Sequence, residues 1–152
     1  MIVAAALPGL PEVRRGDDLA ELLIAAAGRL DDGDVLVIAH KVVSKAEGRV
    51  VALAGVEPGP RALELAAEHN RDPRLIEVIL GESEEIVRSR PGVLICRTRH
   101  GFVCANAGVD ASNAGSEGSL VLLPLDPDAS ARALRARLRE LSAVAPAIVI
   151  AD

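Results

Sequence analysis

A run of five apolar residues, Val35-Leu36-Val37-Ile38-Ala39, constrains the fold of this chain more than any other segment. A strand formed by this run would be apolar on both faces, which is typical of a strand in the interior of a sheet that is covered on both sides. The turn sequence Asp31-Asp32-Gly33 precedes the run. We therefore expect a central strand at residues 34–40.

The remainder of the chain alternates between helix and strand patterns. Helices are expected from a cap at Asp17 to about residue 30, at residues 60–69, at residues 73–80 behind a cap at Asp72, and from Asp126-Pro127-Asp128 onward. Strands are expected at residues 1–6, 49–56, 120–125 and 146–150, and a hairpin at residues 93–104. This alternation predicts the α/β class, with a mixed sheet and flanking helices, in a single domain spanning residues 1–152.

The composition excludes several functional classes. With 152 residues, 50% of them hydrophobic, the chain can bury the core of one domain, and it contains no apolar run long enough to cross a membrane. Its net charge of -5 and its single aromatic residue do not suit a nucleic-acid surface, which needs basic side chains and stacking rings. Residues 1–6 lack a basic segment ahead of the apolar one, so we expect no export signal and a cytoplasmic protein.

The two cysteines, Cys96 and Cys104, have neither the spacing of a zinc site nor the number needed for a disulfide framework. This pattern suits a reducing compartment. A disulfide between the two, across the expected hairpin, remains open.

Two lysines follow the expected central strand. Lys41 and Lys45 are four positions apart, so one helical turn would place both ammonium groups on the same side, with Ser44 nearby. Phosphate is the natural ligand of such a pair. The alternative is that both lysines are solvated in an exposed turn, and the pattern alone does not decide between the two.

Two turns are further candidates for binding. In residues 106–113, Asp110 offers a hard oxygen ligand suited to Mg²⁺ or Mn²⁺, and Asn113 offers an amide donor and acceptor. Such side chains often bind local backbone, so a purely structural turn is the alternative. The loop Gly9-Leu10-Pro11-Glu12-Val13 is rigid enough for its backbone to line a base or a phosphate, although turns of this composition are common.

Taken together, these motifs resemble the coenzyme F420-0:L-glutamate ligase family. The resemblance rests on Gly9-Leu10-Pro11, on residues 38–49, on the turn at residues 105–113, and on Leu122-Leu123-Pro124-Leu125-Asp126-Pro127-Asp128. These segments occur in the family's order and cover nearly the whole chain. The resemblance implies the fold of that family, in a form truncated relative to it.

The resemblance also implies an activity. Enzymes of this family form an amide bond in a GTP-dependent reaction that adds L-glutamate, through a γ-linkage, to coenzyme F420-0. GTP phosphorylates a carboxylate, and the glutamate amine then attacks the acyl phosphate, so that GDP and phosphate are released. Mg²⁺ or Mn²⁺ is the expected cofactor, with K⁺ as a further candidate, and the expected assembly is an intertwined homodimer.

The family's site residues carry over by position. The resemblance assigns the guanine nucleotide to Leu10, Pro11, Glu12, Val13, His40, Lys41, Lys45 and Asn113, and a divalent cation to Asp110 and Asp152. It assigns no catalytic residue. His40 stands where a small or amide polar residue is expected, and a residue that only ends the strand is the alternative.

The length of the chain leaves alternatives open. The family's proteins are longer, and the chain matches their N-terminal part, so we expect a ligase fragment that lacks some metal ligands and part of the nucleotide pocket. A catalytically silent module that binds a guanine nucleotide or a partner is one alternative. One half of a split ligase is the other.

Overall fold

The structure is a computed structural model that describes residues 1–111 and 118–152. Within it the chain forms two compact units, which we call unit 1 (Met1–Arg49 and Pro124–Asp152) and unit 2 (Val50–Leu123). Both units mix helices with small sheets, and the predicted α/β class is confirmed. The prediction of a single domain stays a prediction. None of the helices in the described part combines the length and the apolar composition needed to cross a membrane.

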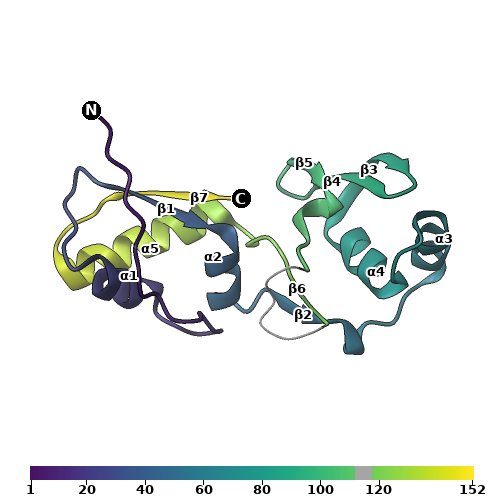
Figure 1. The fold of residues 1–152 in the computed structure, drawn as a ribbon, viewed down its shortest axis with the longest axis horizontal. Coiled ribbons are helices and arrows are strands. Elements are labelled where there is room, and N and C mark those ends of the chain that lie inside the picture. Colours follow the sequence, from purple (N-terminus) through teal and green to yellow (C-terminus); the bar gives the residue numbers. More distant parts are fainter. Residues whose placement is uncertain (112–117) are drawn as a thin grey trace. The chain divides into compact units, whose positions relative to one another are not determined.

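Unit 1 is built around a pair of parallel strands (Figure 1). Its elements are α1 (Leu19–Ala27), β1 (Val35–Ala39), α2 (His40–Ala46), α5 (Pro127–Ser142) and β7 (Ala147–Ala151). β1 and β7 pair in register from Val35 opposite Ala147 to Ala39 opposite Ala151. The two strands therefore end side by side, and the next residue of each chain segment leaves the sheet at the same edge.

The predicted ends of the helices in unit 1 are nearly correct. α5 begins behind Asp126, whose side chain accepts a 2.8 Å hydrogen bond from the amide of Ala129. The cap of α1 is Asp18, which accepts from the amides of Ala20 and Glu21, so the prediction of Asp17 was wrong by one residue. Asp17 instead accepts from the amide of Arg14. Either carboxylate could satisfy an exposed helix start, and local sequence does not separate them.

An ion pair ties the start of α1 to α5. Arg137 donates through Nε to Asp18 Oδ2 at 2.8 Å and also lies near Glu21 and Glu140. The Arg137 hydrogen bond lowers the pKa of the Asp18 carboxyl, helped by the amide of Glu21, while partial burial acts in the opposite direction. The pair therefore joins a helix cap to a contact between two helices.

The core of unit 1 lies between these helices and one face of the strands. The buried side chains are Ala20, Leu23, Leu36, Ile38, Val43, Leu134 and Leu138. On β1, Leu36 and Ile38 face this core, whereas Val35 and Val37 are 58% and 68% exposed. In the described part β1 pairs with β7 alone. The expectation of a central strand covered on both faces was therefore wrong, because β1 has one described strand neighbour and the side chains of its second face are exposed.

Residues 1–6 were also expected to form a strand, and this prediction was wrong. The segment carries no strand assignment and is exposed, with Ile2 at 98% and Val3 at 77%. Together with β1 and Val42 it lines a hollow of about 480 Å³. An apolar segment of strand-like composition forms a strand only when a sheet edge offers its backbone partners.

Unit 2 contains two antiparallel sheets and two helices (Figure 1). Its elements are β2 (Val50–Ala52), the short 3₁₀ helix η1 (Leu53–Gly55), α3 (Pro60–His69), α4 (Pro73–Gly81), β3 (Ser83–Arg90), β4 (Val93–Thr98), β5 (Val103–Ala105), the 3₁₀ helix η2 (Asn106–Gly108) and β6 (Ser119–Val121). One sheet has the order β3-β4-β5, and the other pairs β2 with β6.

The sequence predicted most of these elements. Both helices begin with proline, and Asp72 caps α4 by accepting from the amide of Arg74. The hairpin is present as β4 and β5. The strands expected at residues 49–56 and 120–125 are shorter than predicted, because the first turns into η1 and the second ends at Val121. β3 was missed.

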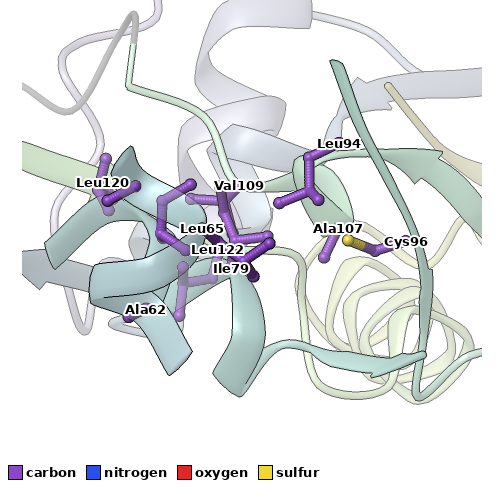
Figure 2. Packing of buried hydrophobic residues seen from close by; sticks show 11 residues of the cluster. Ala62, Leu65, Ile79, Leu94, Cys96, Ala107, Val109, Leu120 and Leu122 are labelled. Carbon is purple, nitrogen blue, oxygen red and sulfur yellow. The ribbon is translucent and has the colours of Figure 1, made fainter. Parts of the chain in front are cut away.

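The core of unit 2 gathers side chains from α3, α4, β4, η2 and β6 (Figure 2). Leu65 on α3, Ile79 on α4, Leu94 on β4 and Leu120 on β6 are almost completely buried. Cys96 on β4 belongs to this core and lies directly opposite Cys104 on β5. Both residues are present as thiols, so the disulfide that the hairpin left open is not formed.

Candidate functional site

The predicted nucleotide residues of unit 1 meet where α2 begins. β1 ends at Ala39, and α2 starts at the next residue, His40, so Lys41, Ser44 and Lys45 all belong to a short helix at the carboxyl end of the parallel strands. Ligands of open α/β sheets characteristically bind outside the carboxyl ends of the strands. The edge of the β1–β7 pair is therefore the first place to look for a site.

Lys45 on α2 contacts the loop at residues 10–13. Its Nζ lies 2.5 Å from Glu12 Oε1, and its side chain is 15% exposed, compared with 61% for Glu12. The lysine stem is thus buried while its ammonium group reaches the surface, where the carboxylate meets it. Two motifs that are far apart in the sequence, and that were assigned to the same nucleotide, are brought into direct contact.

The loop itself is anchored on both sides of Glu12. Leu10 packs against the core of unit 1, and Val13 is buried with 7% of its surface exposed. Pro11 is exposed between them. With Leu10 and Val13 held by apolar contacts and Glu12 held by Lys45, the loop presents Pro11 and the neighbouring backbone to solvent in one conformation.

Lys41 lies four positions before Lys45 on α2 and is partly buried. This spacing places both lysines on one side of the helix, as the sequence predicted. Two ammonium groups one turn apart repel each other, and the carboxylate of Glu12 beside Lys45 offsets part of this repulsion.

His40 and Asp152 form the second close contact of this edge. Nε2 of His40 lies 3.2 Å from Oδ1 of Asp152. The parallel register explains the contact, because Ala39 lies opposite Ala151 and the two residues follow directly. The side chains differ sharply in exposure, at 5% for His40 and 82% for Asp152.

Two polar atoms of α2 are buried without a hydrogen-bond partner among the described residues. They are Nδ1 of His40 and Oγ of Ser44, which lie four positions apart on the same side of the helix. Such atoms are uncommon, because a buried polar group that makes no hydrogen bond is costly. The sequence singled out Ser44 only as a neighbour of the lysines and did not indicate its burial.

Asp110 belongs to unit 2, where a strained turn leads into it. Asn106, Ala107 and Gly108 have φ values of 54°, 53° and 72°. Arg71 holds the first of these residues through a 2.7 Å hydrogen bond from Nη1 to Asn106 Oδ1. The backbone of Asp110 then exchanges two hydrogen bonds with Val121, so its position is fixed by its own unit. Asn113 lies outside the described residues.

The predicted metal ligands fit a hard divalent cation in their chemistry. Asp152 and Asp110 each bring a carboxylate, the donor type that Mg²⁺ and Mn²⁺ prefer. One belongs to unit 1 and the other to unit 2. Across residues 1–111 and 118–152, no group of three or more His, Cys, Asp or Glu side chains is placed to hold a metal ion. Each unit thus offers one carboxylate of the predicted set.

Comparison with known proteins adds independent evidence. Residues 9–152 match the model of the family described as F420-0:Gamma-glutamyl ligase. The chain is 56% identical over 141 residues to a protein of Methanopyrus kandleri named coenzyme F420:L-glutamate ligase, a match that covers 93% of this chain and 55% of the relative. Proteins of the same name from Methanothermobacter thermautotrophicus and Archaeoglobus fulgidus are 46% and 47% identical.

These two matches each cover 95% of this chain, but only 58% and 57% of the respective relative. The chain therefore spans little more than half the length of the curated relatives that it matches.

Proposed function

The chain belongs to the F420-0:gamma-glutamyl ligase family, and we propose that it forms the N-terminal part of a GTP-dependent ligase that joins L-glutamate to coenzyme F420-0 through a γ-linkage. The observation that carries this proposal is the contact between Glu12 and Lys45. It brings the loop at residues 10–13 and helix α2 together, and these are the two motifs of unit 1 to which the family resemblance assigns the nucleotide.

In the proposed reaction a terminal carboxylate of F420-0 attacks the γ-phosphorus of GTP. An acyl phosphate forms and GDP leaves. The amine of glutamate then attacks the acyl carbon, the amide bond forms, and inorganic phosphate departs. Both steps move negative charge between phosphate oxygens, so the site must supply fixed positive charge and exclude water from the acyl phosphate.

The residues of unit 1 suit the first of these tasks. Lys45 would exchange Glu12 for a phosphate oxygen, and Lys41 would add a second positive charge one helical turn away. The anchored loop would line the nucleotide through Leu10, Pro11 and Val13. We propose Asp152 and Asp110 as carboxylate ligands for divalent cations, Mg²⁺ or Mn²⁺, which would neutralise charge on the transferred phosphate. K⁺, a monovalent ion, is a further candidate cofactor.

The wider setting of the enzyme follows from the same resemblance. We propose that it acts as a homodimer in the cytoplasm, with F420-0, L-glutamate and GTP as substrates. Asn113 would contribute a further nucleotide contact, and His40 would lie at the nucleotide through its backbone, since its side chain is buried against Asp152.

One observation favours a second candidate function. The chain spans 55% to 58% of the length of its relatives, and its described residues provide no metal site with three ligands. Acting by itself, such a chain would be a module that binds a guanine nucleotide or a partner without catalysis, or one half of a split ligase. The two candidates predict different results when this chain is joined to the remaining sequence of a relative: the ligase then forms product, whereas the silent module does not.

A ligation assay separates them. This chain, and a fusion of this chain to the remaining sequence of the Methanopyrus kandleri relative, would be incubated with F420-0, L-glutamate, Mn²⁺ and either GTP or ATP. Mass spectrometry would detect the glutamylated product, and the intact relative would serve as the positive control. We expect product from the fusion with GTP only. Nucleotide binding without product from a folded fusion would instead support the silent module.

A further inference from the structure

A buried imidazole faces an exposed carboxylate at the edge of unit 1. The side chain of His40 is 5% exposed, that of Asp152 is 82% exposed, and 3.2 Å separates Nε2 from Oδ1. His40 is the first residue of α2 and Asp152 follows β7, so both are placed by the last pair of the parallel strands, Ala39 and Ala151. The contact is a consequence of the register of the sheet.

The ring of His40 is held in place by burial, whereas the carboxylate of Asp152 would not be held without a partner. Burial restricts the imidazole, and its other nitrogen, Nδ1, has no hydrogen-bond partner. Ser44, one turn further along α2, does not engage the ring either, because its Oγ is also without a partner. Among the described residues, Asp152 is therefore the polar group toward which the ring is directed. A carboxylate side chain without such a partner samples several rotamers.

We infer that His40 is a positioning residue that fixes the Asp152 carboxylate in the orientation needed to ligate a divalent cation. This inference rests on the proposed function, which assigns Asp152 to the metal. With a proton on Nε2, the ring donates to Oδ1 and leaves the second carboxylate oxygen for the cation. Groups that orient metal ligands in this way commonly change metal affinity by about 10- to 100-fold.

The burial of His40 also separates this role from a direct contact with the nucleotide. A ring that is 5% exposed offers little surface to a ligand in solution. The imidazole thus acts on whatever binds at this edge through Asp152. A role limited to packing would leave the affinity for metal unchanged when the donor is removed.

The test measures Mn²⁺ binding to the 152-residue chain by electron paramagnetic resonance of the free ion. Four variants are compared with the unaltered chain: His40→Leu, His40→Gln, Asp152→Asn and His69→Leu. The amide of Gln can replace the Nε2 donor, whereas Leu cannot. His69 is the matched control, because it is also a buried helix histidine with an unpartnered Nδ1, and its Nε2 faces Ser89 in unit 2.

We expect His40→Leu to weaken Mn²⁺ binding by about 10- to 100-fold and Asp152→Asn to weaken it at least as much. His40→Gln should stay within a few-fold of the unaltered chain, and His69→Leu should leave the affinity unchanged. Circular dichroism and thermal unfolding show which variants are folded. Equal Mn²⁺ affinity in the unaltered chain and in folded His40→Leu, with weaker binding in Asp152→Asn, would overturn the role of His40 and leave the proposed function intact.

A second measurement needs no variant and covers the case in which His40→Leu does not fold. Bound Mn²⁺ broadens the NMR signals of nearby nuclei, so the ring signals of His40 should broaden at Mn²⁺ concentrations that leave those of His69 sharp. Sharp His40 signals at saturating Mn²⁺ would overturn the inference. If the unaltered chain binds no Mn²⁺ at all, the metal site of the proposed function fails and the inference fails with it.

Discussion

Lys45 and Glu12, which are 33 positions apart in the sequence, meet through a contact of 2.5 Å between Nζ and Oε1. The contact joins helix α2 to the loop at residues 10–13 and occupies the ammonium group with a carboxylate. A phosphate that binds there competes with Glu12 for the ammonium group. Because the carboxylate is 61% exposed, the pair is worth at most about 1 kcal/mol, and a phosphate with higher charge can replace it.

Replacing Lys45 by Met should weaken GDP binding without unfolding the chain. The methionine keeps most of the buried stem but loses the charge. A lost hydrogen bond to a charged group typically costs about 1.5–3 kcal/mol, which corresponds to a loss of affinity of about tenfold or more. Isothermal titration calorimetry with Mn²⁺ present measures the affinity for GDP. Arg139→Met, which removes an exposed cation from α5 of the same unit, is the control and should bind as the unaltered chain does.

The pair of Asp18 and Arg137 should make the stability of unit 1 sensitive to acid. A carboxyl whose pKa is lower in the folded chain stabilises the fold above its unfolded pKa, and this contribution is lost as the pH falls through the folded pKa. Asp18 follows this case, because Arg137 lowers its pKa from the ordinary value of 3.8.

Asp18→Asn keeps a capping side chain and loses the charge. We expect it to be less stable than the unaltered chain by at most about 1 kcal/mol at neutral pH, since Arg137 is 41% exposed. The difference should shrink below pH 3.8, as chemical denaturation at a series of pH values would show. When Arg137 is already replaced by Gln, the further change Asp18→Asn should alter the free energy of unfolding much less at neutral pH. A difference that grows toward acid pH would contradict this assignment.

Helix α3 offers a matched pair of leucines for testing the core of unit 2. Leu65 is fully buried, whereas Leu63 on the same helix is 52% exposed. Leu65→Ala should cost about 2–5 kcal/mol of unfolding free energy, because it removes buried methyl groups and leaves a cavity. Leu63→Ala has the same helix propensity change and should cost well under half as much. If urea denaturation showed similar losses of unfolding free energy for Leu65→Ala and Leu63→Ala, α3 would pack differently from the arrangement described.

Gly108 is the critical residue of the turn that precedes Asp110. Its φ of +72° favours glycine, and an added Cβ would lie 2.7 Å from the side chain of Leu123. Gly118 has a similar φ of +81° but nothing within 4 Å of such an atom. Gly108→Ala should therefore lower the unfolding free energy by about 1–3 kcal/mol more than Gly118→Ala does. Equal thermal shifts for the two variants would show that the turn can relax around the added methyl.

Local sequence predicted the elements whose ends carry strong signals. Prolines at the first helical position, and the caps Asp72 and Asp126, fixed the starts of α3, α4 and α5. The hairpin of β4 and β5 was recognisable from its two β-rich runs and the turn at Gly101. These signals act over a few residues, so they need no knowledge of the rest of the chain.

β3 was missed because its residues lack the alternation of a half-buried strand. Of the residues of β3, only Ser83 and Ile86 are partly buried, and the others are exposed. Its exposed charged side chains lie beside the neighbouring strand β4. Arg97 on β4 lies 2.7 Å from Glu85, which supports the pairing across the sheet. A strand that is stabilised mainly by its neighbour cannot be read from its own apolar pattern.

The resemblance proposed which residues belong to the site, and that membership stays a prediction, but the contacts between those residues could not be predicted. The resemblance assigned Lys45, Glu12, His40 and Asp152 to one site, and the first two indeed touch. The contact of His40 with Asp152 depends on the parallel register of β1 and β7, which are separated by most of the sequence. Register of this kind is set by tertiary packing, so it cannot be predicted from a local sequence motif.

The central claim is that α2 and the loop at residues 10–13 form a guanine nucleotide site, and titration of GDP and ADP into the 152-residue chain tests it most directly. With Mn²⁺ present, calorimetry should show one GDP site per chain, much weaker binding of ADP, and loss of GDP affinity in Lys45→Met. If the folded chain binds no GDP, or binds GDP and ADP equally with no dependence on Lys45, the account is contradicted.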